Sequence, residues 1–278
     1  MIGTTGAEHT SKIISKCRSL KEFRYEGCRP LRQGCQYIAD GLRDMAKHHQ
    51  GLTRLYLEGS YGCSTETDPV GSLCEALKKM RYLTHVKLGD CGLEQDGSKA
   101  VLRALAPQKG LISLSLQENE ITSKNARQLV KVIQSNQSSL EVLNLETNEL
   151  TSVGVEILVQ AFAKGSSLRE LNLGGNQIGT RGAKALIESA KVFTRLEKIF
   201  LDENGFTDDI VEELQATFGN KLQSLEENDD NDADDDLEED DDEEDDEEDD
   251  DDDDDDNAMQ ELSQALGRQK LTPDDVSI

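Results

Sequence analysis

Amide and carboxylate side chains recur together along the middle and later parts of this sequence, at regular intervals. Asn119, Asn148, Asn176 and Asn204 follow one another at spacings of 29, 28 and 28 residues. An amide both donates and accepts hydrogen bonds, so it can satisfy the backbone groups of neighbouring turns. The carboxylates that stand beside these amides, or at matching places in earlier segments, are Glu58, Asp90, Glu118, Glu120, Glu146, Glu149, Asp202 and Glu203. Together they could attract a basic partner.

No set of side chains in the sequence predicts catalysis by the chain itself. The patterns Gly-x-x-x-x-Gly-Lys-Ser/Thr, His-Glu-x-x-His and Gly-x-Ser-x-Gly are all absent. His48-His49 lacks a third ligand at a suitable spacing, and the six cysteines include no C-x-x-C pair. We therefore expect no metal site, no cofactor and no enzymatic activity of its own.

A repeated pattern must position these groups. Seven segments fit L-x-x-L-x-L-x-x-N with apolar substitutes, and their first leucines advance by 32, 31, 28, 29, 28 and 28 residues, as follows: Leu20, Leu52, Leu83, Leu111, Leu140, Leu168 and Leu196. In L-x-L the leucines point to one side of a short strand, and the later apolar residues of each unit have helical spacing. The sequence predicts an α/β fold, a leucine-rich-repeat solenoid of the ribonuclease-inhibitor type, a horseshoe with strands inside and helices outside.

The position of each amide within the repeat favours a structural role. Asn119, Asn148, Asn176 and Asn204 stand where the strand ends, and Cys28 and Cys91 take the same position in earlier repeats. We interpret these six residues as a structural ladder that satisfies backbone groups. The carboxylates fall in the strand-to-helix loops and form the candidate partner-binding rim, which would steer a basic partner. The alternative is a solvated edge without a binding role.

The acidic end of the chain predicts a change of domain. Between positions 226 and 256, 27 of 31 residues are Asp or Glu, which equals the formal net charge of -27. We predict a leucine-rich-repeat domain at 1–225, a disordered acidic tail at 226–256 and a short C-terminal segment at 257–278 able to form an amphipathic helix. The negative charge of the chain disfavours nucleic acid as a partner. The sequence contains no stretch of 18 apolar residues, so we do not expect it to insert into a membrane. We expect an intracellular monomer.

The amino-acid sequences of several repeats, together with the acidic tail that follows them, resemble those of one protein family. Val86–Cys91, Leu116–Ile121 and Leu201–Phe206, followed by the acidic tail, are similar to Ran GTPase-activating proteins. The segments Ile2–Glu8 and Leu20–Arg24 resemble the plant-type branch of that family. The resemblance implies a cytoplasmic regulator of nucleocytoplasmic transport, near or at the nuclear envelope, which binds the GTP form of the small GTPase Ran.

The same resemblance implies that the chemistry takes place within Ran. A glutamine of the GTPase holds the attacking water, and the family uses a loop Asn to orient that glutamine. Ile2-Gly3-Thr4 aligns on Ile178-Gly179-Thr180, so the family's loop Asn would precede Met1 and the chain opens halfway through a repeat. We expect no catalytic residue within 1–278 and a chain that lacks its first repeats.

Two other functions fit an acidic leucine-rich protein. One is histone binding or chaperoning, as in acidic nuclear phosphoproteins, although those proteins use shorter repeats with little outer helix. The other is a general protein-interaction scaffold whose tail maintains solubility.

Overall fold

The repeats form short strands that stack side by side in chain order. The computed structural model describes residues 3–28, 31–59, 69–163, 165–223 and 225. Its strands pair in parallel in the order β1 to β7. The bounds of these strands are β1 (Glu22–Arg24), β2 (Arg54–Tyr56), β3 (His85–Lys87), β4 (Ser113–Ser115), β5 (Val142–Asn144), β6 (Glu170–Asn172) and β7 (Lys198–Phe200).

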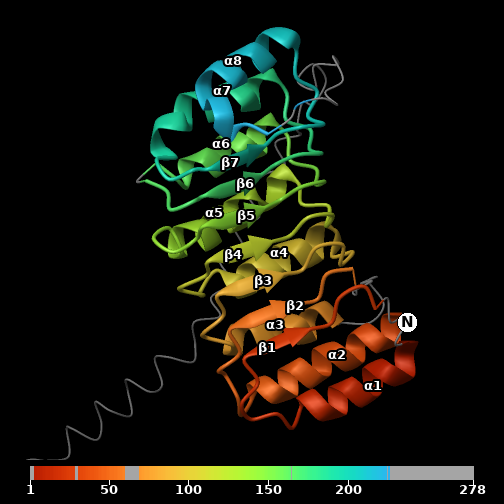
Figure 1. Cartoon of the computed structure of the whole chain (residues 1–278). Coiled ribbons are helices and arrows are strands. Elements are labelled where there is room, and N and C mark those ends of the chain that lie inside the picture. The colour runs from red at the N-terminus through yellow and green to blue at the C-terminus, as the bar shows by residue number, and fades with distance from the viewer. Residues whose placement is uncertain (1–2, 29–30, 60–68, 164, 224, 226–278) are drawn as a thin grey trace, which may run out of the picture. The chain divides into compact units, whose positions relative to one another are not determined.

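A helix follows each strand and lies on one side of the sheet, as Figure 1 shows. The α-helices are α1 (Gly3–Ile14), α2 (Leu31–Ala46), α3 (Pro69–Lys79), α4 (Glu94–Leu105), α5 (Ala126–Ser135), α6 (Ser152–Gln160), α7 (Thr180–Ser189) and α8 (Asp208–Phe218). Short 3-10 turns are η1 (Ser123–Asn125), η2 (Ala190–Val192) and η3 (Gly219–Lys221). Consecutive helices pack against each other along the array.

The core lies between the sheet and the helices. The middle residue of every strand pairs in register with the middle residue of the next, and the whole row is buried: Phe23, Leu55, Val86, Leu114, Leu143, Leu171 and Ile199. Each helix adds an apolar face at helical spacing, such as Val101, Leu102 and Leu105 of α4. The fold is therefore the predicted α/β leucine-rich-repeat solenoid of parallel strands alternating with helices.

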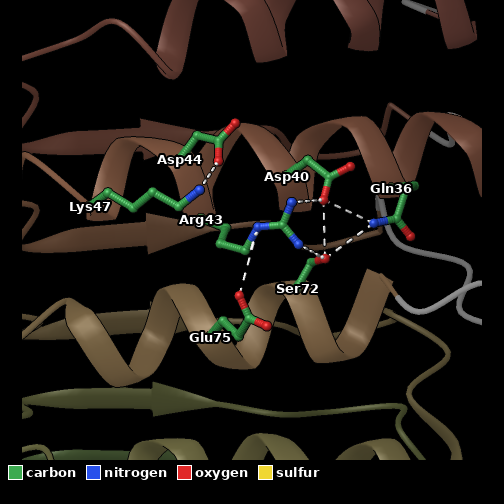
Figure 2. Close-up of polar contacts among 7 residues, drawn as sticks. All are labelled: Gln36, Asp40, Arg43, Asp44, Lys47, Ser72 and Glu75. Carbon is green, nitrogen blue, oxygen red and sulfur yellow. Dashed lines mark hydrogen bonds and ion pairs between the residues drawn. The ribbon is translucent and has the colours of Figure 1, made fainter.

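A polar cluster joins α2 to α3, where the repeat is longest. Arg43 Nη1 donates to Ser72 Oγ at 2.9 Å, and Ser72 Oγ donates to Asp40 Oδ1 at 3.1 Å. Arg43 also pairs with Asp40 at 2.9 Å and with Glu75 of α3 at 3.7 Å, as Figure 2 shows. Because Ser72 is only 5% exposed, these bonds satisfy a hydroxyl that has little access to water.

The last described residues continue the sheet by one bridge. Leu222 pairs in parallel with Ile199, and Gln223 N donates to Ile199 O at 2.9 Å. The predicted tail at 226–256 and the segment at 257–278 lie outside the described residues, so both stay predictions, as does the domain boundary at 225. No helix in the described ranges combines the length and the apolar character needed to cross a membrane.

Candidate functional site

The strand-to-helix connections form one edge of the sheet, because all the strands run in the same direction. We call the described parts of these connections the acidic edge: 25–28, 57–59, 88–93, 116–122, 145–151, 173–179 and 201–207. Backbone hydrogen bonds tie each connection to the next. Asp90 N donates to Gln117 O at 2.9 Å, Glu118 N to Glu146 O at 3.0 Å, and Thr147 N to Gly174 O at 2.8 Å. The edge is thus a continuation of the sheet and not a set of independent loops.

One position in each connection adopts the left-handed backbone conformation. The residue before each ladder position has a positive φ in all seven repeats, in the order Gly27, Gly59, Asp90, Glu118, Thr147, Gly175 and Glu203. Glycine adopts this conformation without strain, whereas for other residues it costs about 1 kcal/mol or more of conformational free energy. Three of the predicted rim residues, Asp90, Glu118 and Glu203, therefore occupy positions where a glycine would be less strained. Glu120 also has a positive φ of 56°.

This strain predicts the outcome of a glycine substitution at Glu118. Because Glu118 has a φ of 55°, we expect Glu118→Gly to leave the free energy of unfolding unchanged or to raise it by up to about 1 kcal/mol. Glu149→Gly is the matched control on the same edge, since Glu149 is not among the positive-φ residues, and it should lose about 0.5–1 kcal/mol. Urea unfolding of both variants measures the difference. Equal losses would show that the backbone at Glu118 is not strained.

The four ladder asparagines are buried and fully engaged by the backbone. Asn148 Oδ1 accepts from Asn119 N at 3.1 Å and from Ile121 N at 3.0 Å. Its Nδ2 donates to the carbonyls of Leu116, Leu145 and Glu146 at 2.9–3.2 Å. Asn119, Asn176 and Asn204 donate to equivalent carbonyls of their own and the preceding repeat. These bonds occupy the amide groups, so we do not propose the amides as ligand-binding groups.

The two ladder cysteines differ from each other. Cys91 is 1% exposed, and its Sγ donates to the carbonyls of Leu57 and Gly89, both at 3.5 Å. Cys28 is half-buried, and its Sγ donates to Glu26 O at 3.3 Å. A thiol is a weaker hydrogen-bond donor than an amide. Direct backbone hydrogen bonds join neighbouring connections in the early and the later repeats alike.

The carboxylates of the acidic edge fall into two groups. Glu58 and Glu146 turn toward the open face of the sheet: Gln117 donates to Glu58, Lys87 approaches Glu58 at 3.8 Å, and Asn172 donates to Glu146 at 3.1 Å. The remaining predicted rim residues lie further along the connections. Asp90, Glu118, Glu120, Glu149 and Glu203 are exposed, whereas Asp202 is half-buried. Glu146 is exposed as well, and Glu58 is half-buried. The structure therefore brings all eight predicted carboxylates to one edge, where all but Glu58 and Asp202 are exposed.

Acidic and basic residues are segregated to opposite edges of the sheet. The described strand-to-helix connections carry the eight predicted carboxylates and Glu26, and they contain no Lys or Arg. In contrast, the described helix-to-strand connections carry two acids, Glu141 and Glu197, against the following bases: Lys16, Arg18, Lys21, Lys47, Arg81, Lys109, Arg169 and Arg195. Acids near helix N-termini and bases near helix C-termini also suit the helix dipoles. The sequence prediction missed Glu26, although Glu26 occupies the same repeat position as Glu58.

A charged cluster covers the open face of β1 and β2. Glu22 pairs with Arg54 at 2.6 Å and also with Arg24, whose guanidinium lies 4.1 Å from the centroid of the Tyr56 ring. The hydrogen bond from Arg24 lowers the pKa of Glu22, and burial lowers the pKa of His85 on the neighbouring β3. These charges neutralise each other, so this face offers a partner little net charge. Within the described ranges, no group of three or more His, Cys, Asp or Glu side chains could hold a metal ion.

Comparisons with known proteins identify repeats of the same kind. A leucine-rich-repeat family model matches residues 166–186. The chain is 29% identical over 191 residues to the NACHT, LRR and PYD domains-containing protein 14 of Mus musculus, covering 68% of this chain and 18% of that protein. It is 27% identical over 189 residues to the ribonuclease inhibitor of Sus scrofa, covering 67% of this chain and 41% of that protein. The chain thus spans less than half the length of either relative.

A solved structure gives a weaker match. The actin-binding site 2 of leiomodin-1 aligns with a TM-score of 0.45 and 16% identity, over 57% of this chain and 91% of that one. None of these three proteins is a Ran GTPase-activating protein. The comparisons thus show a leucine-rich-repeat protein, with repeats similar to those of the ribonuclease inhibitor.

Proposed function

On this leucine-rich-repeat scaffold for protein interaction, we propose that the acidic edge binds a basic surface of the small GTPase Ran in its GTP form. One observation carries the binding mode, namely the segregation of acids from bases between the two edges of the sheet. A partner that approaches the acidic edge meets carboxylates from several adjacent repeats, and the described connections themselves contain no Lys or Arg. Of the carboxylates of this edge, the strand residues Lys87 and Arg24 pair only with Glu58 and Glu26, in the first repeats. Such a field raises the rate of association with a basic protein.

The backbone supports this binding mode. Hydrogen bonds between neighbouring connections hold Asp90, Glu118 and the residues after them in fixed positions. A surface that is already ordered loses little conformational entropy when a partner binds. Asp90, Glu118 and Glu203 adopt the left-handed conformation, although glycine at these positions would remove the backbone strain. Carboxylates at strained positions are consistent with a role in binding.

The choice of Ran rests on the resemblance of the repeats and the tail to Ran GTPase-activating proteins. Under this proposal the chain contributes to GTPase activation by binding, and hydrolysis is carried out by groups of Ran. We propose a cytoplasmic location, near the nuclear envelope, and a monomeric chain. We assign no catalytic residue, metal or cofactor to the chain.

Binding of the full chain to Ran tests this function. We expect Ran loaded with a non-hydrolysable GTP analogue to bind at least about tenfold more tightly than Ran bound to GDP, a difference of about 1.4 kcal/mol. Core histones serve as the comparison for the histone-binding alternative. Calorimetry at physiological salt gives the three affinities. Equal affinity for both forms of Ran, or tighter binding to histones than to Ran, would contradict the proposal.

A further inference from the structure

One exposed carboxylate of the acidic edge is held in place by another side chain. Asn172 Nδ2 donates to Glu146 Oε2 at 3.1 Å, and no described Lys or Arg pairs with Glu146. Glu58, in contrast, is half-buried and already has Lys87 at 3.8 Å. Three further exposed carboxylates make no side-chain hydrogen bond or ion pair with another described residue: Glu118, Glu120 and Glu149. Glu146 therefore combines a fixed orientation with a charge that no described cation compensates.

The amide of Asn172 is itself oriented by the backbone. Asn172 is half-buried on the open face of β6, and its Oδ1 accepts from Gly174 N at 3.0 Å. An amide has one acceptor oxygen and one donor nitrogen, so this bond fixes the nitrogen toward Glu146. The backbone of Glu146 is held as well, because Glu118 N donates to Glu146 O at 3.0 Å. The main chain and Oε2 of Glu146 are thus both fixed, and Oε1 remains for a partner.

The surroundings of Glu146 favour a basic group as the ligand. Gly174 stands at the equivalent position of the next connection, where Thr147 N donates to Gly174 O at 2.8 Å. A methyl group at Gly174 would lie 2.9 Å from Asp202 Oδ1 and 3.4 Å from Asn172 Oδ1. The atoms that face this position are therefore acceptor oxygens. A Lys or Arg side chain carries only donors and is complementary to them.

We propose that Asn172 is a positioning residue, which holds the carboxylate of Glu146 in the orientation that binds a Lys or Arg side chain of the partner. This inference rests on the proposed function of the acidic edge and identifies one of its contact residues. A side chain that is free in the unbound protein loses rotamer freedom on binding, which weakens binding by about two- to tenfold. The hydrogen bond from Asn172 avoids much of that loss. Because Asn172 is neutral, it should affect the dissociation rate and leave electrostatic steering unchanged.

Asn144 provides a matched control on the neighbouring strand. It is the register partner of Asn172, and their strands β5 and β6 lie side by side in Figure 1. Asn144 Oδ1 accepts from Glu146 N at 2.9 Å, just as Asn172 Oδ1 accepts from Gly174 N. However, Asn144 Nδ2 faces the neutral Gln117 Oε1 at 3.4 Å. Alanine at either position removes one bond to the backbone, but only Asn172→Ala also releases a carboxylate.

The test uses the full chain and Ran loaded with a non-hydrolysable GTP analogue. The variants are Asn172→Ala, Asn144→Ala, Glu146→Gln and the combination of Asn172→Ala with Glu146→Gln. Stopped flow at physiological salt gives the association and dissociation rates of each variant. The four chains that carry or lack Asn172 and Glu146 form a double-mutant cycle, which shows whether Asn172 acts through Glu146. Urea unfolding verifies that all the variants keep the fold.

We expect Asn172→Ala to speed dissociation by about threefold, and Asn144→Ala to change it by less than about 1.5-fold. Association rates should stay unchanged in both variants. In the chain that already carries Glu146→Gln, Asn172→Ala should have no further effect. The same acceleration in that chain would overturn the inference, since Asn172 would then act through the fold, and so would an unchanged dissociation rate for Asn172→Ala. Failure of the unaltered chain to bind Ran would refute the proposed function itself, and the inference with it.

Discussion

Replacing Asn148 with alanine should lower the free energy of unfolding by about 3 kcal/mol or more. The side chain is 6% exposed and forms five hydrogen bonds with backbone groups of two repeats, its own and the preceding one. Alanine would leave two N–H donors and three carbonyls without this partner, in a place that water reaches poorly. Each unsatisfied buried group costs about 1–3 kcal/mol, so the loss should be large even if some carbonyls find other donors.

Asn144 is the matched control for this substitution. It lies on the open face of β5, four residues earlier, and its Oδ1 accepts a single backbone bond from Glu146 N at 2.9 Å. Because Asn144 is half-buried, water can replace part of its bonding, and Asn144→Ala should cost about 1 kcal/mol. Urea unfolding of both variants provides the comparison. A loss at Asn148 no larger than the loss at Asn144 would argue against the structural role of the ladder.

The fold can be predicted from the sequence because the spacing of the apolar residues in each repeat specifies a strand and its stacking on the next. Leu114 and Leu116 share one side of a strand, and an equivalent pair recurs at each step, so the pattern predicts both the strand and the stacking of its neighbours. The position of Asn119 in that pattern likewise predicts that the amide lies at the end of a strand. The structure adds the individual hydrogen bonds, which depend on the turn that follows each strand.

The candidate site can be predicted less fully from the sequence than the fold can. The pattern predicts that Glu58 and Glu118 lie on the same edge, but it cannot separate their environments. Glu58 contacts Gln117, which comes from the connection after β4, two repeats later, and this contact depends on the stacking of three repeats. The left-handed backbone at Glu118 also cannot be predicted from the sequence, because a glutamate does not indicate a positive φ. Gly27 and Gly59, at the same repeat position, do indicate it. The opposite charges of the two edges emerge only when each connection is assigned to its edge.

Neutralising part of the acidic edge should have the largest effect on binding to Ran. The variant combines Glu118→Gln, Glu120→Gln, Glu146→Gln and Glu149→Gln, from two adjacent connections. Glutamine keeps the size of each side chain and removes its charge. Electrostatic steering changes association rates by about 10–10³-fold, so the loss of four charges from one edge should slow association by about tenfold at low salt. The rate of dissociation should change less, because the contacts themselves are largely conserved.

The association rate with GTP-bound Ran, measured by stopped flow between low and high salt, tests the central claim most directly. The control variant removes four carboxylates elsewhere, by Glu141→Gln, Glu188→Gln, Glu212→Gln and Glu213→Gln, and so has the same net charge. We predict that the edge variant associates about tenfold more slowly than the control at low salt, and that the two rates converge as the Debye length falls to about 3 Å near 1 M salt. Equal rates and equal salt dependence for the two variants would contradict the assignment of the acidic edge as the site that attracts the partner.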